Sequence, residues 1–175
     1  MKRISFISVV LISMTMLFVS CTGADGRDGR DGRDATVCSM SINVTANDWT
    51  FLSSGSWCLS LTSTSITQSV VDNGMVLVYM KDPYYYSWKL IPLTYYYTDV
   101  DSEQNILYLS CSLETSYYLN GLDIYWTESD FYDGNNPGNQ TFRVVILEGS
   151  SISKAPIDFA DFKAVVKAYN ITEWM

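Results

Sequence analysis

The chain contains no histidine among its 175 residues. Histidine is the commonest general base and zinc ligand and a member of the usual hydrolase triads, so its absence removes those forms of catalysis. The sequence also has no glycine-rich phosphate loop, no dinucleotide-binding fingerprint and no Cys-x-x-Cys pair. These absences predict a protein that is not an enzyme and that uses no cofactor.

Positive charge is scarce. The chain has 11 Lys and Arg residues against 19 Asp and Glu residues, which gives a net charge of -8 at pH 7. Without a basic cluster, the chain is not expected to bind nucleic acid or to be drawn to anionic lipid by charge.

Long apolar runs are also scarce, since the only one is Ile4 to Val19. It follows Lys2 and Arg3, and it is shorter than the roughly 18 or more apolar residues of a membrane span. A positive start, a short apolar run and a small residue at its end are typical of a secretory signal. We therefore predict that residues 1–20 are a signal peptide and that the protein is exported.

Residues 17–21, Leu-Phe-Val-Ser-Cys, resemble the lipobox of bacterial lipoproteins. That resemblance implies cleavage before Cys21 and acylation of this cysteine, which would hold the protein to a membrane through two or more acyl chains. Phe18 departs from the Leu, Val or Ile usual three positions before the cysteine. The alternative is an ordinary signal peptide and a soluble, secreted product.

Glycine recurs at every third residue from Gly23, and the last triplet ends at Asp34. This is the collagen period, but four triplets without proline are too few to predict a stable triple helix. We expect residues 21–36 to form an extended, hydrated tether that spans roughly 20 to 25 Å as a flexible coil. Trimerisation through the triplets is the alternative, and a monomer is favoured.

Residues 37–175 are rich in tyrosine, tryptophan, valine, isoleucine and threonine, which favour half-buried strands. Alternating or β-branched runs separated by turn residues predict a mainly β protein, a single antiparallel β-sandwich. The almost continuous apolar run Thr141 to Glu148 is typical of a central strand. Apolar residues at helical spacing predict a C-terminal helix at about 158–170, capped by Asp158.

Three cysteines follow Cys21, namely Cys38, Cys58 and Cys111. Export permits disulfides, but an odd count leaves at least one thiol unpaired, and the sequence cannot choose among the three pairs. Cys58 and Cys111 lie in strand-like runs, where we expect buried free thiols that act as small apolar residues.

Aromatic side chains form the most prominent pattern. Because side chains alternate between the faces of a strand, we expect each tyrosine triplet to split between core and surface and to stabilise the sheet. The alternative is an exposed platform that stacks on sugar rings. The residues concerned are Tyr84, Tyr85, Tyr86, Trp88, Tyr95, Tyr96 and Tyr97.

Two sets of side chains are candidates for chemistry. The oxygens of Asp130, Asp133, Asn135 and Asn139 are of the kind that calcium takes, but their spacing does not fit the twelve-residue calcium loop, and turns use the same residues. Asp123 and Glu128 could be imagined as paired glycosidase carboxylates. Residues five apart in a strand lie on opposite faces, so this pair is not expected to converge.

Five stretches carry a resemblance to a known family, namely 66–68, 73–79, 88–92, 141–146 and the closing helix through 169–171. Over nearly its whole length, the chain resembles the collagen-like, glycine-triplet lipoproteins of Bacteroidota-type bacteria. The resemblance implies an envelope lipoprotein of unassigned activity and transfers no catalytic residue. We therefore expect a lipid-anchored, non-enzymatic structural or interaction module of the bacterial cell envelope, on the periplasmic or cell-surface side of the outer membrane, with a glycan or an envelope protein as partner. The alternative function is a carbohydrate-binding lipoprotein.

Overall fold

The computed structural model describes residues 37–134, 136–152 and 156–172. The chain divides into a unit of residues 1–33 and a unit of residues 34–175, and all the described residues belong to the second. The predicted signal peptide, Cys21 and the glycine triplets lie outside the described residues. No helix in the described ranges is long and apolar enough to cross a bilayer.

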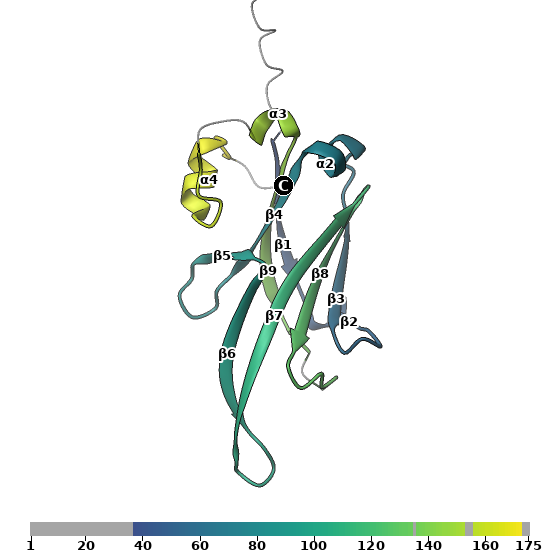
Figure 1. The fold of residues 1–175 in the computed structure, drawn as a ribbon, viewed down its shortest axis with the longest axis vertical. Helices are drawn as coiled ribbons and strands as arrows, with labels where there is room; N and C mark the ends of the chain where they lie inside the picture. The colour runs from purple at the N-terminus through teal and green to yellow at the C-terminus, as the bar shows by residue number, and fades with distance from the viewer. Residues whose placement is uncertain (1–36, 135, 153–155, 173–175) are drawn as a thin grey trace, which may run out of the picture. The chain divides into compact units, whose positions relative to one another are not determined.

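Two antiparallel sheets make up the domain, which confirms the predicted mainly β sandwich (Figure 1). The four-stranded sheet has the order β1-β9-β4-β5, and the five-stranded sheet has the order β2-β3-β8-β7-β6. The strands are β1 (Val37–Val44), β2 (Thr50–Phe51), β3 (Trp57–Thr62), β4 (Met75–Lys81), β5 (Trp88–Ile91), β6 (Leu93–Val100), β7 (Ile106–Tyr118), β8 (Gly121–Glu128) and β9 (Gln140–Leu147). The helices are η2 (Ala46–Asp48), α2 (Gln68–Asn73), α3 (Gly149–Ile152) and α4 (Phe162–Ala168).

The main core lies between the two sheets. Because side chains alternate along a strand, every second residue of β8 points inward, and Leu122 and Ile124 are almost fully buried. They belong to the same buried cluster as Phe142 and Val144 of the opposite sheet. Each fully buried side chain of this kind contributes roughly 1.5 to 3 kcal/mol through burial of apolar surface.

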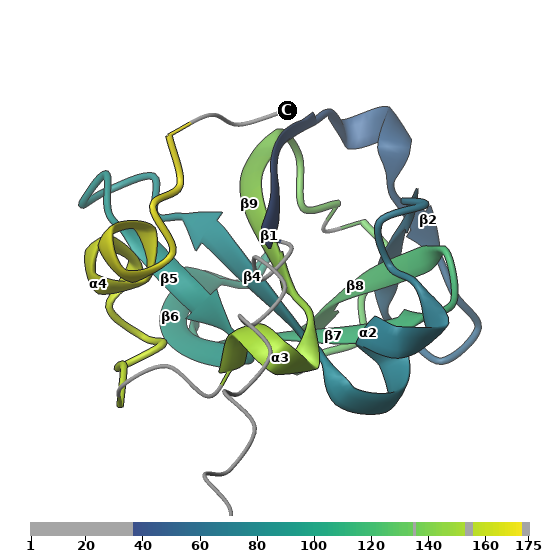
Figure 2. The same ribbon diagram turned by 90° about the horizontal axis from the view of Figure 1, so that it is seen from above.

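The central strands β4 and β9 of the four-stranded sheet are buried on both faces, which explains their nearly continuous apolar sequences. A second cluster on its outer face joins Tyr79 and Val145 to Phe162 and Val165 of α4. The Tyr79 hydroxyl donates to the Phe159 carbonyl at 2.7 Å. Figure 2 shows α4 beside β4 and β5, away from β7 and β8. The prediction that the run from Thr141 forms a central strand is confirmed, since β9 pairs with both β1 and β4.

The closing helix is shorter than predicted, and its cap is a different aspartate. The Asp161 carboxylate accepts hydrogen bonds from the backbone N–H groups of Lys163 and Ala164, so α4 begins at Phe162. The Asp158 carboxylate instead accepts from the Ala160 N–H, within the turn before the helix. The predicted Asp158 cap is therefore wrong, because this turn separates it from the first helical residue.

All three described cysteines are free. Cys58 and Cys111 are buried in strands, as predicted, whereas Cys38 is half-buried and its thiol donates to the Ser65 hydroxyl at 3.3 Å.

The hairpin of β6 and β7 extends beyond its neighbour. Strand β8 pairs with β7 only from Cys111 onward, so residues 106–110 of β7 form strand pairs with β6 alone. We call residues 96–110 the arm. In Figure 1 the arm reaches the bottom of the domain, whereas α3 lies at the top. Val37 pairs with Leu147, two residues before α3, so the described chain begins at the end opposite the arm.

Candidate functional site

Exposed apolar side chains gather on the arm. Five of the twelve large hydrophobic residues that are exposed in the described ranges lie there, and three more form the loop between β4 and β5. Singly exposed apolar residues are ordinary, but a contiguous group is typical of a binding surface. The five on the arm are Tyr96, Val100, Ile106, Leu107 and Tyr108.

The register of the hairpin sets which of these residues share a face. Tyr96 lies opposite Ser110, and Thr98 lies opposite Tyr108. Directly paired residues, and residues two apart, point to the same side of a sheet. The outward face therefore carries Tyr96 and Tyr108, which are 84% and 83% exposed.

The second tyrosine triplet splits between the two faces, as predicted. Tyr95 points into the core, where its ring packs edge-on against Trp126 and its hydroxyl donates to the Met80 sulfur at 3.5 Å. Tyr97 also points inward and is half-buried, whereas Tyr96 between them faces solvent. The triplet thus supplies both a core anchor and a surface ring.

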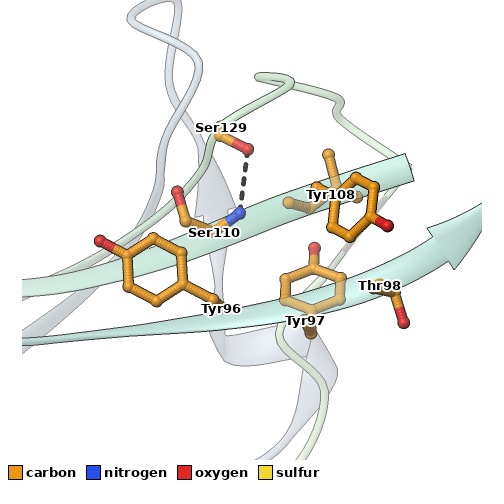
Figure 3. Close-up of a pocket in the computed structure, with 7 residues that line it drawn as sticks. Tyr96, Tyr97, Thr98, Tyr108, Ser110 and Ser129 are labelled. Atoms are coloured by element: carbon orange, nitrogen blue, oxygen red, sulfur yellow. Dashed lines mark hydrogen bonds between the residues drawn. The ribbon is translucent and has the colours of Figure 1, made fainter. Parts of the chain in front are cut away.

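An open groove of about 390 Å³ lies along the arm, and residues of both faces of the hairpin line it (Figure 3). The backbone N–H of Ser110 donates to the Ser129 hydroxyl at 3.0 Å, and the Ser129 N–H donates to the Ser110 carbonyl at 2.9 Å. These two bonds hold the segment after β8 against the side of the arm. The groove is lined by Tyr96, Tyr97, Thr98, Tyr108, Leu109, Ser110 and Ser129.

A buried carboxylate fixes the base of the arm. Glu128 is 7% exposed, and it accepts hydrogen bonds from the Tyr97 hydroxyl and, at 2.7 Å, from the Trp126 indole N–H. Burial, together with the hydrogen bond and negative charge of Glu128, raises the pKa of the Tyr97 phenol above its ordinary value. Burial and the same carboxylate raise the pKa of the Cys111 thiol. A neutral tyrosine donor on a buried carboxylate is a strong, charge-assisted bond that holds β6 to β8.

The first tyrosine triplet does not split, so that prediction is wrong. Tyr84, Tyr85 and Tyr86 lie in a turn before β5, and all three are more than three-quarters exposed. The Asp82 carboxylate accepts from the backbone N–H groups of Tyr84 and Tyr85, and Tyr86 has a positive φ of 53°. This aspartate-capped turn overrides the strand preference of three tyrosines.

Trp88 belongs to neither tyrosine surface. It is half-buried, its ring lies 5.4 Å from the ring of Phe162 in α4, and the Arg143 guanidinium lies 4.4 Å from its centre. The predicted aromatic set is therefore spread over four places, which are the β4–β5 loop, the α4 contact, the core and the arm.

Two of the predicted calcium ligands accept hydrogen bonds from backbone N–H groups and so stabilise the loop itself. The Asp130 carboxylate accepts from the Tyr132 N–H, and the Asn139 amide oxygen accepts from the Ala46 N–H, both at 3.2 Å. Asn135 lies outside the described residues, and Asp133 is exposed. Within the described ranges no group of three or more His, Cys, Asp or Glu side chains could hold a metal ion, and calcium stays a prediction.

Asp123 and Glu128 lie on opposite faces of β8, as the alternation of side chains along a strand predicts. Asp123 accepts hydrogen bonds from the hydroxyls of Tyr118 and Tyr125 on the outer face. Glu128 lies inside, against Trp126. The two carboxylates therefore do not form a glycosidase pair.

The charges of the five-stranded sheet are all negative. No lysine or arginine occurs between Lys89 and Arg143, or between Arg33 and Lys81, and these two stretches contain all five strands. At the tip of the arm, the Asp101 carboxylate accepts hydrogen bonds from the Asn105 side-chain amide and from the backbone N–H groups of Asn105 and Glu103, and these bonds lower its pKa. The groove lies behind this acidic tip and has no charged residue in its own lining.

Tyr108, Ser110 and Ser129 were not identified from the sequence. The sequence did contain a signal for Tyr108 and Ser110. A hairpin turn closed by Asp101 and Asn105 fixes the pairing register of the two strands, and in this register Tyr108 is the diagonal neighbour of Tyr96. Ser129 could not be placed in this way, since it follows β8 and meets the arm only in the folded sheet.

No family model matches the chain, and no curated protein or solved structure matches it. The assignment of a function therefore depends on the residues of this chain.

Proposed function

We propose that the chain is a lipid-anchored, non-enzymatic interaction module of the bacterial cell envelope, and that the arm is its binding surface. The observation that carries the proposal is the group of exposed aromatic and aliphatic side chains on the arm, at the end of the domain opposite Val37. A chain tethered through its N-terminal segment would carry the domain by the Val37 end. The arm would then point away from the membrane, toward other envelope components.

The anchor in this proposal is Cys21, acylated as the resemblance to lipobox sequences implies. The segment from Cys21 to residue 36 would act as a spacer of roughly 20 to 25 Å. That reach is enough to keep the domain clear of the headgroups while holding it near the membrane. The outer membrane, on its periplasmic or cell-surface side, is the location that the resemblance to glycine-triplet lipoproteins favours.

The thiols of the five-stranded sheet and the carboxylate at the base of the arm support a binding role over a catalytic one. A thiolate is the reactive form of cysteine, and burial raises the pKa values of the Cys58 and Cys111 thiols, which keeps both protonated. Each oxygen of the Glu128 carboxylate already accepts a hydrogen bond from an aromatic side chain. The groove itself presents rings, hydroxyl groups and one leucine.

The anchor can be tested with two matched cysteine variants expressed in a bacterial host. Cys21→Ala should move the protein from the membrane fraction to the soluble fraction and abolish acyl labelling, because stable anchoring needs the acyl chains. Cys38→Ala, which changes another cysteine outside the anchor, should leave both properties unchanged. Persistence of membrane binding and labelling in Cys21→Ala would refute the anchor.

The binding surface can be tested by photo-cross-linking in intact cells. A benzophenone amino acid replaces Tyr108 on the arm or, as the control, Tyr118 at the other end of the same strand, where it is 47% exposed. We expect an adduct, either a discrete protein or a polysaccharide smear, from position 108 and little from position 118. Equal adducts from both positions, or none from position 108, would contradict the assignment of the arm.

A further inference from the structure

We propose that the groove on the arm binds a neutral glycan, with Tyr96 and Tyr108 contacting successive sugar units of one chain. The inference rests on the proposed binding role of the arm and names the class of ligand. It is carried by the juxtaposition of two exposed tyrosine rings with hydroxyl groups on a sheet surface that lacks cations.

The two rings are placed to contact one extended ligand. Tyr96 and Tyr108 are diagonal neighbours across the β6–β7 pair, a relation that separates their backbones by about 7 to 8 Å. Figure 3 shows the two rings apart from each other along the arm, with Ser110 and Ser129 alongside. A tyrosine offers an apolar ring face and a polar tip, which matches a sugar ring with its C–H face and its rim of hydroxyls.

Hydroxyl groups beside the rings can replace water around a sugar. The hydroxyls of Thr98 and Ser110 make no hydrogen bond to any other described residue. The Ser129 oxygen accepts from the Ser110 N–H, which leaves the Ser129 O–H able to donate. Neutral donors and acceptors of this kind exchange water for ligand hydroxyls at little desolvation cost compared with buried charges.

The distribution of charge favours a neutral ligand over an anionic one. A uronate, sulfate or phosphate group on a glycan would need a cation, and all five strands of this sheet lie in stretches without lysine or arginine. The net charge of -8 would further repel a polyanion. A cationic ligand would be drawn to Asp99, Asp101 and Glu103 near the tip, but none of these lines the groove.

The base of the arm is fixed before any ligand arrives. Tyr97 is held by Glu128, and Asp101 closes the turn at the tip, so the strands that carry the two rings have little freedom to lose on binding. A surface organised in advance binds more tightly, because less conformational entropy is lost. This is the expected arrangement for a shallow site that relies on two ring contacts.

The test is affinity electrophoresis of the purified lipidated protein, in detergent, through native gels that contain a polysaccharide. The neutral probes are mixed-linkage β-glucan, galactomannan and dextran, and the anionic probes are polygalacturonate and dextran sulfate. We expect at least one neutral polysaccharide to slow the parent and the anionic ones to leave it unaffected. The double variant Tyr96→Ala/Tyr108→Ala should weaken this retardation tenfold or more, whereas Tyr96→Phe/Tyr108→Phe should retain most of it.

The matched control is Tyr84→Ala/Tyr85→Ala, which removes two equally exposed tyrosines from the β4–β5 loop and should leave retardation unchanged. The inference is overturned if no neutral probe slows the parent, if an anionic probe does so instead, or if the loop variant rather than the arm variant loses binding. If position 108 cross-links to a protein and no neutral polysaccharide slows the parent, the glycan proposal is overturned and the proposed binding function of the arm is retained. Retardation that survives the arm variant, with no adduct from position 108, would overturn both.

Discussion

The two tyrosine triplets should contribute very differently to stability, although their sequences are identical. In the second triplet, Tyr95→Ala removes a ring packed against Trp126 within the main core, and such truncations cost about 3 kcal/mol or more. Tyr96→Ala removes a side chain that is 84% exposed and should change the free energy of unfolding by less than about 0.5 kcal/mol. In the first triplet, Tyr84→Ala and Tyr85→Ala should both fall within that small range, because both side chains face solvent.

The measurement is urea unfolding of single alanine variants, monitored by tryptophan fluorescence, with thermal melts alongside. For a domain of this size, a loss of about 3 kcal/mol corresponds to a melting temperature roughly 10 °C lower. The contrast between Tyr95→Ala and Tyr96→Ala should therefore be plain, and the contrast between Tyr84→Ala and Tyr85→Ala should be absent. A Tyr96 variant as unstable as the Tyr95 variant, or a large difference within the first triplet, would refute the assigned faces.

Three further outcomes are expected. Burial raises the pKa values of Tyr79 and Tyr95, whereas a tyrosine in the unfolded chain ionises near pH 10. The stability that these two phenols supply is therefore complete below about pH 10 and falls as the pH rises further. The urea midpoint of unfolding should accordingly be lower at pH 11 than at pH 8. A thiol reagent should label Cys38, which is half-buried, before Cys111, which is 1% exposed, and equal rates in the native protein would contradict that burial. Deleting residues 23–34 should leave the oligomeric state unchanged by light scattering, and a trimer present only with the triplets would show that they assemble the protein.

Strand content was predictable because the pattern that reveals it is local. Apolar alternation and turn residues predicted a mainly β sandwich, and the apolar run Thr141 to Glu148 predicted the central strand β9, which spans Gln140–Leu147. The order of strands in each sheet was not predictable in this way. Pairing of β1 with β9 joins residues about a hundred positions apart, and no periodicity in one segment specifies such a partner.

The errors arose where a short polar side chain competes with propensity. The side chains of Tyr84 to Tyr86 were predicted to alternate between core and surface, as they would in a strand. Instead, the Asp82 carboxylate accepts hydrogen bonds from the backbone N–H groups of Tyr84 and Tyr85, which favours a turn over strand pairing. At the closing helix, Asp158 was predicted as the cap, but Asp161 caps α4, and the first helical residue, Phe162, packs against Tyr79. The groove combined predicted residues with unpredicted ones, since Tyr96 was in the candidate set and Tyr108 was not.

The position of β1 also has a mechanical consequence. A pull on the chain at Val37, opposed by a load on the arm at the other end of the domain, acts along the axis of β1. The hydrogen bonds of an antiparallel pair run perpendicular to the strands, so this force shears all eight residue pairs between β1 and β9 together instead of peeling them apart one at a time. A domain held by this end would thus resist drag cooperatively, because all the pairs between β1 and β9 would have to break together.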